Sequence, residues 1–134
     1  MALRRRTWVE AVLAGAVAVA LPALAAEADL LAERGRQIAL QHCVRCHVVD
    51  PARPFTGISS TPSFQLLVTA FDDWRERFET FHTRRPHPAV VRFAGVAPLS
   101  EGPPIVQTVD LQLADIEAIV AFAESLKQAA DAAR

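Results

Sequence analysis

Two cysteines and a histidine lie within five consecutive residues, Cys43-Val44-Arg45-Cys46-His47. Cysteines separated by two residues and followed directly by histidine are typical of the covalent attachment of a c-type haem. Each thiol can add across one vinyl group of the porphyrin, and the adjacent imidazole then lies under the ring, where it can bind the iron. The segment therefore predicts one covalent haem c, with Cys43 and Cys46 as attachment residues and His47 as the proximal iron ligand.

This segment uses both cysteines of the chain. No cysteine is left for a disulfide framework or for a four-cysteine zinc site. The Cys-x-x-Cys spacing alone would also suit a thiol redox pair or half of a metal site. The histidine directly after the second cysteine favours haem over these alternatives.

The N-terminal residues have the composition of an export signal. A positive segment, Arg4–Arg6, precedes the apolar run Val12–Ala26, in which Ala23-Leu24-Ala25 is a small-x-small cleavage site. The apolar run has 15 residues, fewer than the roughly 20 that a spanning helix needs. We therefore expect cleavage of residues 1–25, a mature domain of residues 26–134 and a periplasmic location. Retention of the segment as a membrane anchor is the alternative.

Export is consistent with haem attachment. In an oxidising periplasm a Cys-x-x-Cys pair would close into a disulfide unless thioether bonds occupied its sulfur atoms. Removal of the signal changes the formal charge from −1 to −3. This balance gives no reason to expect nucleic acid or an anionic membrane surface as a partner. We expect no stable membrane insertion once the signal is removed.

The segments around the motif are predicted to be mostly helical. Apolar residues recur at three- and four-residue steps in Asp29–His42, which contains Gly35, and in Leu113–Leu126. A glycine in a helix interior costs about 1 kcal/mol relative to alanine, so the close approach of another helix would explain Gly35. We expect two short middle helices, Phe64–Phe71 and Asp73–His82, the second with an aromatic face.

Proline and glycine interrupt the pattern in two places. Val48–Ser63 is predicted to be a long loop. Arg84–Pro88 is predicted to be a break, because each proline favours extended backbone in the residue before it. Residues 89–108 contain too many prolines and glycines for a helix, and parts of the stretch could be extended, namely Val90, Val91, Phe93 and Ile105–Val109.

With these elements in place, the sequence resembles the class I monohaem cytochrome c family over nearly all of the mature chain. Gly35–His47 resembles the N-terminal helix and haem segment of that family, and Asp115–Phe122 resembles its last helix. The resemblance implies an all-α cytochrome c fold in which the terminal helices cross, with Phe122 packed at Gly35. Short middle helices and long loops would surround one covalently attached haem.

The segment Thr61–Phe64 resembles the proline-containing loop that follows the haem segment in many bacterial members. By this resemblance, the carbonyl of Pro62 accepts a hydrogen bond from Nδ1 of His47. Such a bond fixes the orientation of the ring and raises its basicity as a ligand.

The sequence departs from the family at the sixth iron ligand. That ligand is usually a methionine before the last helix, but the only methionine here is Met1, and Val90 stands where relatives with a Pro-His-Pro-x-Met segment carry theirs. Three alternatives stay open: ligation by His87 or His82, an open iron covered by Val90, Val91 or Phe93, or water or another weak ligand. Among the protein side chains we favour His87, since it lies between prolines in the segment expected to face the haem.

These features predict a periplasmic one-electron carrier, not an enzyme, that meets redox partner proteins by transient docking. The alternative is a haem-based ligand-binding or sensor protein with an open distal site, or one with minor peroxidase-like activity. Three arginines lie near the segment expected to face the haem, namely Arg84, Arg85 and Arg92. Each is either a solvated charge or a partner of a haem propionate.

Overall fold

The computed structural model describes residues 25–84, 87, 89–97 and 107–134. The expected export signal therefore lies outside the described residues, except for residue 25. Contacts divide the chain into two units, Met1–Leu30 and Leu31–Arg134, and the second holds the candidate site. Within the described ranges, no helix has the length and apolar character needed to cross a membrane.

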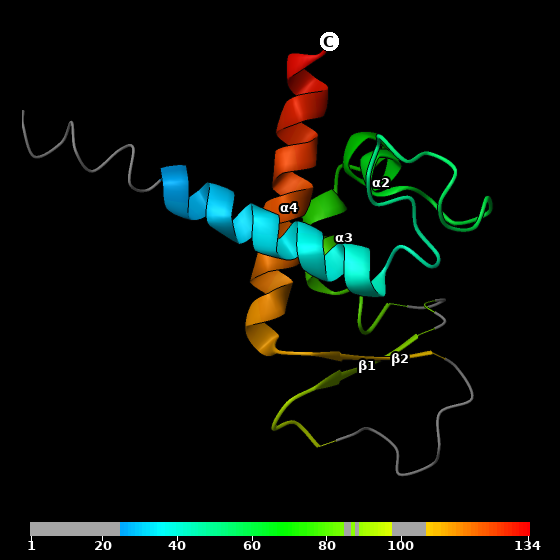
Figure 1. Cartoon of the computed structure of the whole chain (residues 1–134), viewed down its shortest axis with the longest axis vertical. Helices are drawn as coiled ribbons and strands as arrows, with labels where there is room; N and C mark the ends of the chain where they lie inside the picture. The colour runs from blue at the N-terminus through cyan, green and yellow to red at the C-terminus, as the bar shows by residue number, and fades with distance from the viewer. Residues whose placement is uncertain (1–24, 85–86, 88, 98–106) are drawn as a thin grey trace, which may run out of the picture. The chain divides into compact units, whose positions relative to one another are not determined.

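Most of the described secondary structure is helical. The first helix covers residues 25–42 and is followed by α2 (Phe64–Ala70), α3 (Trp74–Glu79) and α4 (Leu113–Ala132), as Figure 1 shows. The predicted helices are thus confirmed, although the first begins before Asp29 and α3 ends before His82. The N-terminus of α2 is capped by Ser63, whose hydroxyl accepts a hydrogen bond from the Leu66 amide at 3.0 Å.

Strands β1 (Ala89–Phe93) and β2 (Gln107–Leu111) pair in parallel (Figure 1). The expectation of an all-α fold is therefore wrong for this part of the chain. β-branched and aromatic side chains in β1, among them Val90 and Val91, favour extended over helical backbone. The described unit is a mostly helical small domain with a small two-stranded sheet.

The alternation of side chains gives the sheet an inner and an outer face. Val91 is paired with Val109, and Phe93 with Leu111; these side chains belong to the hydrophobic core or pack against it. Val90, at which the family resemblance would place a methionine, falls between them and is 39% exposed. The inner face of β1 therefore presents Val91 and Phe93 rather than Val90.

From residue 31 onward, the N-terminal helix crosses α4 at Gly35 (Figure 1). A Cβ atom on Gly35 would lie only 1.8 Å from the carbonyl oxygen of Ala118, so the crossing requires glycine. The close approach of another helix is confirmed. The nearest atoms belong to Ala118 and Ile119, whereas Phe122, one turn further on, has a ring contact with Phe64 at 6.2 Å between centroids.

A buried carboxylate reinforces this crossing. Asp115 is only 8% exposed, and its Oδ1 accepts a hydrogen bond from the Arg34 guanidinium at 2.7 Å. Its Oδ2 accepts a second hydrogen bond, at 2.8 Å, from the amide of Gln112, and the Gln112 side chain completes a capping box. The Asp115 side chain thus caps the first turn of α4 and joins this helix to the N-terminal helix.

Phe64 lies at the centre of the aromatic core. Its ring contacts Phe78 of α3 edge-on, with centroids 5.0 Å apart, and Phe122 of α4. It also contacts the His47 ring, at 5.5 Å. The core that joins the three helices therefore extends directly to the cysteine–histidine segment. The remaining buried apolar residues are Ala39, Val49, Val68, Val109, Leu111, Ala118, Ile119, Val120 and Ala123.

Candidate functional site

The cysteine–histidine segment is wound into a tight turn at the end of the N-terminal helix. The carbonyl of Cys43 accepts hydrogen bonds from the amides of Cys46, at 3.0 Å, and His47, at 2.9 Å. Residues three apart in a helical turn lie on the same side of it, so this winding places the two cysteines next to each other. Both are partly buried and neither is in a disulfide.

The environment of Cys43 does not favour a thiolate. Burial, and to a smaller extent the neighbouring Cys46, raise the pKa of the Cys43 thiol to about 12. Reactive and metal-binding cysteines usually show the opposite shift, because the thiolate is the reactive form.

The His47 ring is held by a hydrogen bond from its Nδ1 to the carbonyl oxygen of Pro62, at 2.7 Å. A carbonyl oxygen can only accept, so Nδ1 carries the proton and the neutral ring has its lone pair on Nε2. Burial lowers the pKa of His47, and the Pro62 carbonyl acts in the opposite direction. The hydrogen bond that the family resemblance implied is present, and it leaves Nε2 as the atom that could bind a metal.

The loop that supplies Pro62 is tied back to the turn by its own backbone. The amide of Ile58 donates to the carbonyl of Cys46 at 2.9 Å, and the amide of Phe64 donates to the carbonyl of Val48 at 3.0 Å. These hydrogen bonds lie on either side of Pro62 in the sequence. They fix the position of its carbonyl opposite His47.

Gly57 is the residue that lets this loop approach so closely. It has a positive φ of 79°, and a Cβ on it would lie 2.8 Å from the carbonyl carbon of His47. The sequence marks it only as a loop residue, because neither a positive φ nor a backbone contact can be recognised from one glycine. Gly57 is therefore a site residue that sequence reasoning missed.

We expect Gly57→Ala to destabilise the protein by about 3 kcal/mol, through a strained backbone and a clash with the turn. Gly95→Ala is the matched control, since Gly95 has a φ of 77° but no neighbouring atom within 4 Å of the position that a Cβ would take. Only the strain, about 1 kcal/mol, should appear in the control. Urea unfolding of both variants measures the difference, and equal losses would show that the contact with His47 is unimportant.

Two further histidines lie in a second aromatic cluster. The Phe81 ring is 5.8 Å from His82 and 5.7 Å from His87, and the His82 ring is 5.2 Å from Phe93. Nδ1 of His82 and Nδ1 of His87 are buried without a hydrogen-bond partner in the described part of the chain. Burial lowers the pKa of His87, and the charge of His47 lowers it further, whereas a backbone hydrogen bond to Ala89 raises it.

Arg84 and Arg92, two of the three arginines considered as propionate partners, are paired with carboxylates. Arg92 is bound to Asp110, its cross-strand neighbour, through two hydrogen bonds of 2.6 and 2.8 Å. Arg84 lies 3.1 Å from Glu76 and 3.7 Å from Asp73. These pairs favour a structural role over propionate binding. The third candidate, Arg85, lies outside the residues that the structure describes.

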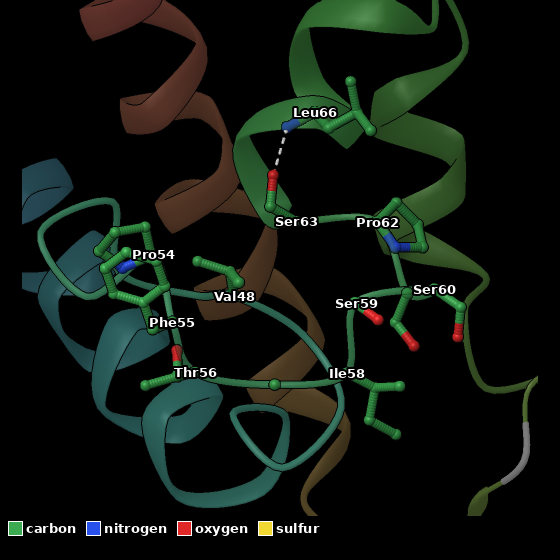
Figure 2. Close-up of a pocket in the computed structure, with 12 residues that line it drawn as sticks. Val48, Pro54, Phe55, Thr56, Ile58, Ser59, Ser60, Pro62, Ser63 and Leu66 are labelled. Carbon is green, nitrogen blue, oxygen red and sulfur yellow. Dashed lines mark hydrogen bonds between the residues drawn. The ribbon is translucent and has the colours of Figure 1, made fainter.

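A pocket of about 610 Å³ lies over the loop that follows the motif (Figure 2). Its lining has apolar and hydroxyl side chains but no titratable group, and Cys43, Cys46 and His47 do not take part in it. Figure 2 also shows the Ser63–Leu66 cap at its edge. The pocket therefore shares Gly57 and Pro62 with the site but adds no titratable group to it. It is lined by Val48, Pro54, Phe55, Thr56, Gly57, Ile58, Ser59, Ser60, Thr61, Pro62, Ser63 and Leu66.

The structure brings Cys43, Cys46, His47 and Pro62 together, and it places His82 and His87 in the second aromatic cluster, against Phe81. No three His, Cys, Asp or Glu side chains among the described residues are grouped so that they could hold a metal ion by themselves. Comparison of the chain with protein-family models, with curated proteins and with solved structures found no match.

Proposed function

We propose that this chain is an exported c-type cytochrome that carries one electron at a time in the periplasm. One haem c is bound through thioether bonds to Cys43 and Cys46, with Nε2 of His47 as the proximal iron ligand. The observation that carries the proposal is the 2.7 Å hydrogen bond from His47 Nδ1 to Pro62. It holds the imidazole in the tautomer that a metal requires, directly beside two unpaired cysteines.

The packing of the helices supports a cytochrome c fold. The N-terminal helix leads into the cysteine turn and crosses α4 at Gly35, and the short helices α2 and α3 pack against α4. The parallel strands β1 and β2, which follow α3 and precede α4 in the chain, are an addition to the expected pattern. We therefore propose a cytochrome c fold with one local addition, the two-stranded sheet of β1 and β2.

When bound, haem supplies reversible one-electron chemistry. The chain's own residues position it and exclude water. Phe64 packs edge-on against the His47 ring, and the buried side chains around Phe64 keep that contact dry. The proposed sixth ligand is His87, because it lies between two prolines in the segment expected to face the haem. Ligation by two histidines gives a lower reduction potential than ligation by histidine and methionine.

This assignment implies an electron-transfer protein and not an enzyme, because two protein ligands leave no iron position for a substrate. Redox partner proteins then need only a brief encounter that brings the haem edge near their own centre. Small interfaces suffice for such transient contacts.

A second candidate is a haem-based ligand-binding or sensor protein. It is favoured by the inner face of β1, where apolar Val91 and Phe93 lie in the segment that carries a methionine ligand in the family. If neither His82 nor His87 binds the iron, these side chains would cover an open coordination position.

Optical spectra of the purified protein, oxidised and reduced, distinguish the two candidates. For the electron carrier we expect a low-spin ferrous form that does not change on addition of carbon monoxide, because both axial positions are taken. A high-spin ferrous form that binds carbon monoxide readily would contradict the carrier and favour the sensor.

A further inference from the structure

Phe64, the first residue of α2, contacts the cysteine–histidine segment through both its side chain and its backbone. Its ring lies against the His47 ring, with the centroids 5.5 Å apart and the ring planes at 67°. Its amide donates a hydrogen bond to the carbonyl of Val48, the residue after His47, at 3.0 Å. One residue of α2 is thus in contact with the imidazole and with the backbone that follows it.

The acceptor of the His47 hydrogen bond lies two residues before Phe64 in the chain. That acceptor is the carbonyl of Pro62, at 2.7 Å. Ser63, between Pro62 and Phe64, caps α2 by accepting a hydrogen bond from the Leu66 amide at 3.0 Å (Figure 2). The cap fixes the backbone at the start of the helix. The position of the Pro62 carbonyl therefore depends on the position of Phe64.

Phe64 is itself held in place by two other helices. Its side chain is in the buried core, only 4% exposed, and its ring contacts Phe78 of α3 at 5.0 Å and Phe122 of α4 at 6.2 Å. Within the described residues, Phe64 has a ring contact with His47, whereas Phe78 has none. The packing of α3 and α4 therefore reaches the imidazole through the Phe64 ring.

We propose that Phe64 is the positioning residue of His47, which holds the imidazole in the orientation in which Nδ1 donates to Pro62. The inference rests on the proposed haem attachment, because that hydrogen bond sets the orientation and the basicity of a ligating histidine. Paired aromatic rings stabilise each other beyond the burial of their area. Loss of the Phe64 ring therefore weakens the hydrogen bond between His47 and Pro62, whereas loss of an equally buried ring elsewhere in the core does not.

The test compares Phe64→Leu with Phe78→Leu in the haem-loaded protein. Phe78 is the matched control, because it is also 4% exposed and its ring contacts Phe64. Both substitutions remove one ring from the same core, so urea unfolding should show similar losses of stability. The measured quantity is the rate at which the Nδ1 proton of His47 exchanges with solvent, followed by NMR in the reduced protein. We expect exchange to be about fivefold faster in Phe64→Leu, through local opening, and unchanged in Phe78→Leu.

Equal exchange rates in the two variants would overturn the positioning role, since core packing in general would then control the hydrogen bond. A Phe64→Leu variant with the wild-type exchange rate would overturn it as well. If Phe64→Leu does not fold, Phe64→Met and Phe78→Met replace the pair, because methionine fills a core gap without a ring. Failure of the proposed function looks different, because the wild-type protein would then carry no covalent haem at all.

Discussion

Replacement of both cysteines, in Cys43→Ala/Cys46→Ala, should reduce covalent haem to background. Each thioether bond needs one of these sulfur atoms, and the chain has no other cysteine. The remaining His47 could hold haem only through the iron, and such haem is lost on denaturation. Haem staining after denaturing electrophoresis measures the effect, with the protein produced alongside the haem-attachment machinery.

Arg45→Ala is the control for this experiment. Arg45 lies between the cysteines in the same turn, and its side chain donates a hydrogen bond to Gln107 at 3.0 Å on the exposed surface. Its loss should leave haem attachment intact. A cysteine-free variant that still retains haem after denaturation would contradict the assignment of Cys43 and Cys46.

Gly35→Ala should be the most destabilising single substitution at the helix crossing, with a loss of about 3 kcal/mol in the free energy of unfolding. The new Cβ would lie 1.8 Å from the carbonyl oxygen of Ala118. A backbone oxygen cannot turn aside as a side chain can, so the two helices must separate. Because the N-terminal helix leads directly into Cys43, haem attachment should fall as well.

Urea unfolding measures this loss, and Gln37→Ala is the control on the same helix. Gln37 is exposed, and within the described residues its side chain donates a hydrogen bond to Glu33 alone. A surface substitution of this kind typically changes stability by less than about 0.5 kcal/mol. Equal stability of the Gly35 and Gln37 variants would mean that the helices do not cross as closely as described.

The sequence was sufficient to predict the helices and to identify the cysteine–histidine segment, which the structure forms as a turn. Both depend on short-range patterns: three- and four-residue periodicity for the helices, and five adjacent residues for the cysteine–histidine turn. The close approach of another helix at Gly35 was also predictable, because a glycine destabilises a helix interior and a close contact would explain its presence. The residue that packs against Gly35 could not be predicted, since Ala118 and Phe122 are one turn apart and either could face the crossing.

The β1–β2 sheet depends on long-range pairing. Val91 and Val109 are partners across 18 positions of sequence, and no local pattern fixes that register. The same holds for the cluster of His82, His87 and Phe93, which the fold assembles from a turn, a proline-flanked residue and a strand. Their chemistry could be listed from the sequence, but their proximity could not.

The most direct test of the account is the intact mass of the wild-type protein, exported in the presence of the haem-attachment machinery and measured after denaturation. We expect the polypeptide mass, after removal of the signal, plus one haem. A mass equal to the polypeptide alone, or lower by two hydrogen atoms as a Cys43–Cys46 disulfide requires, would contradict the proposal that this turn binds haem.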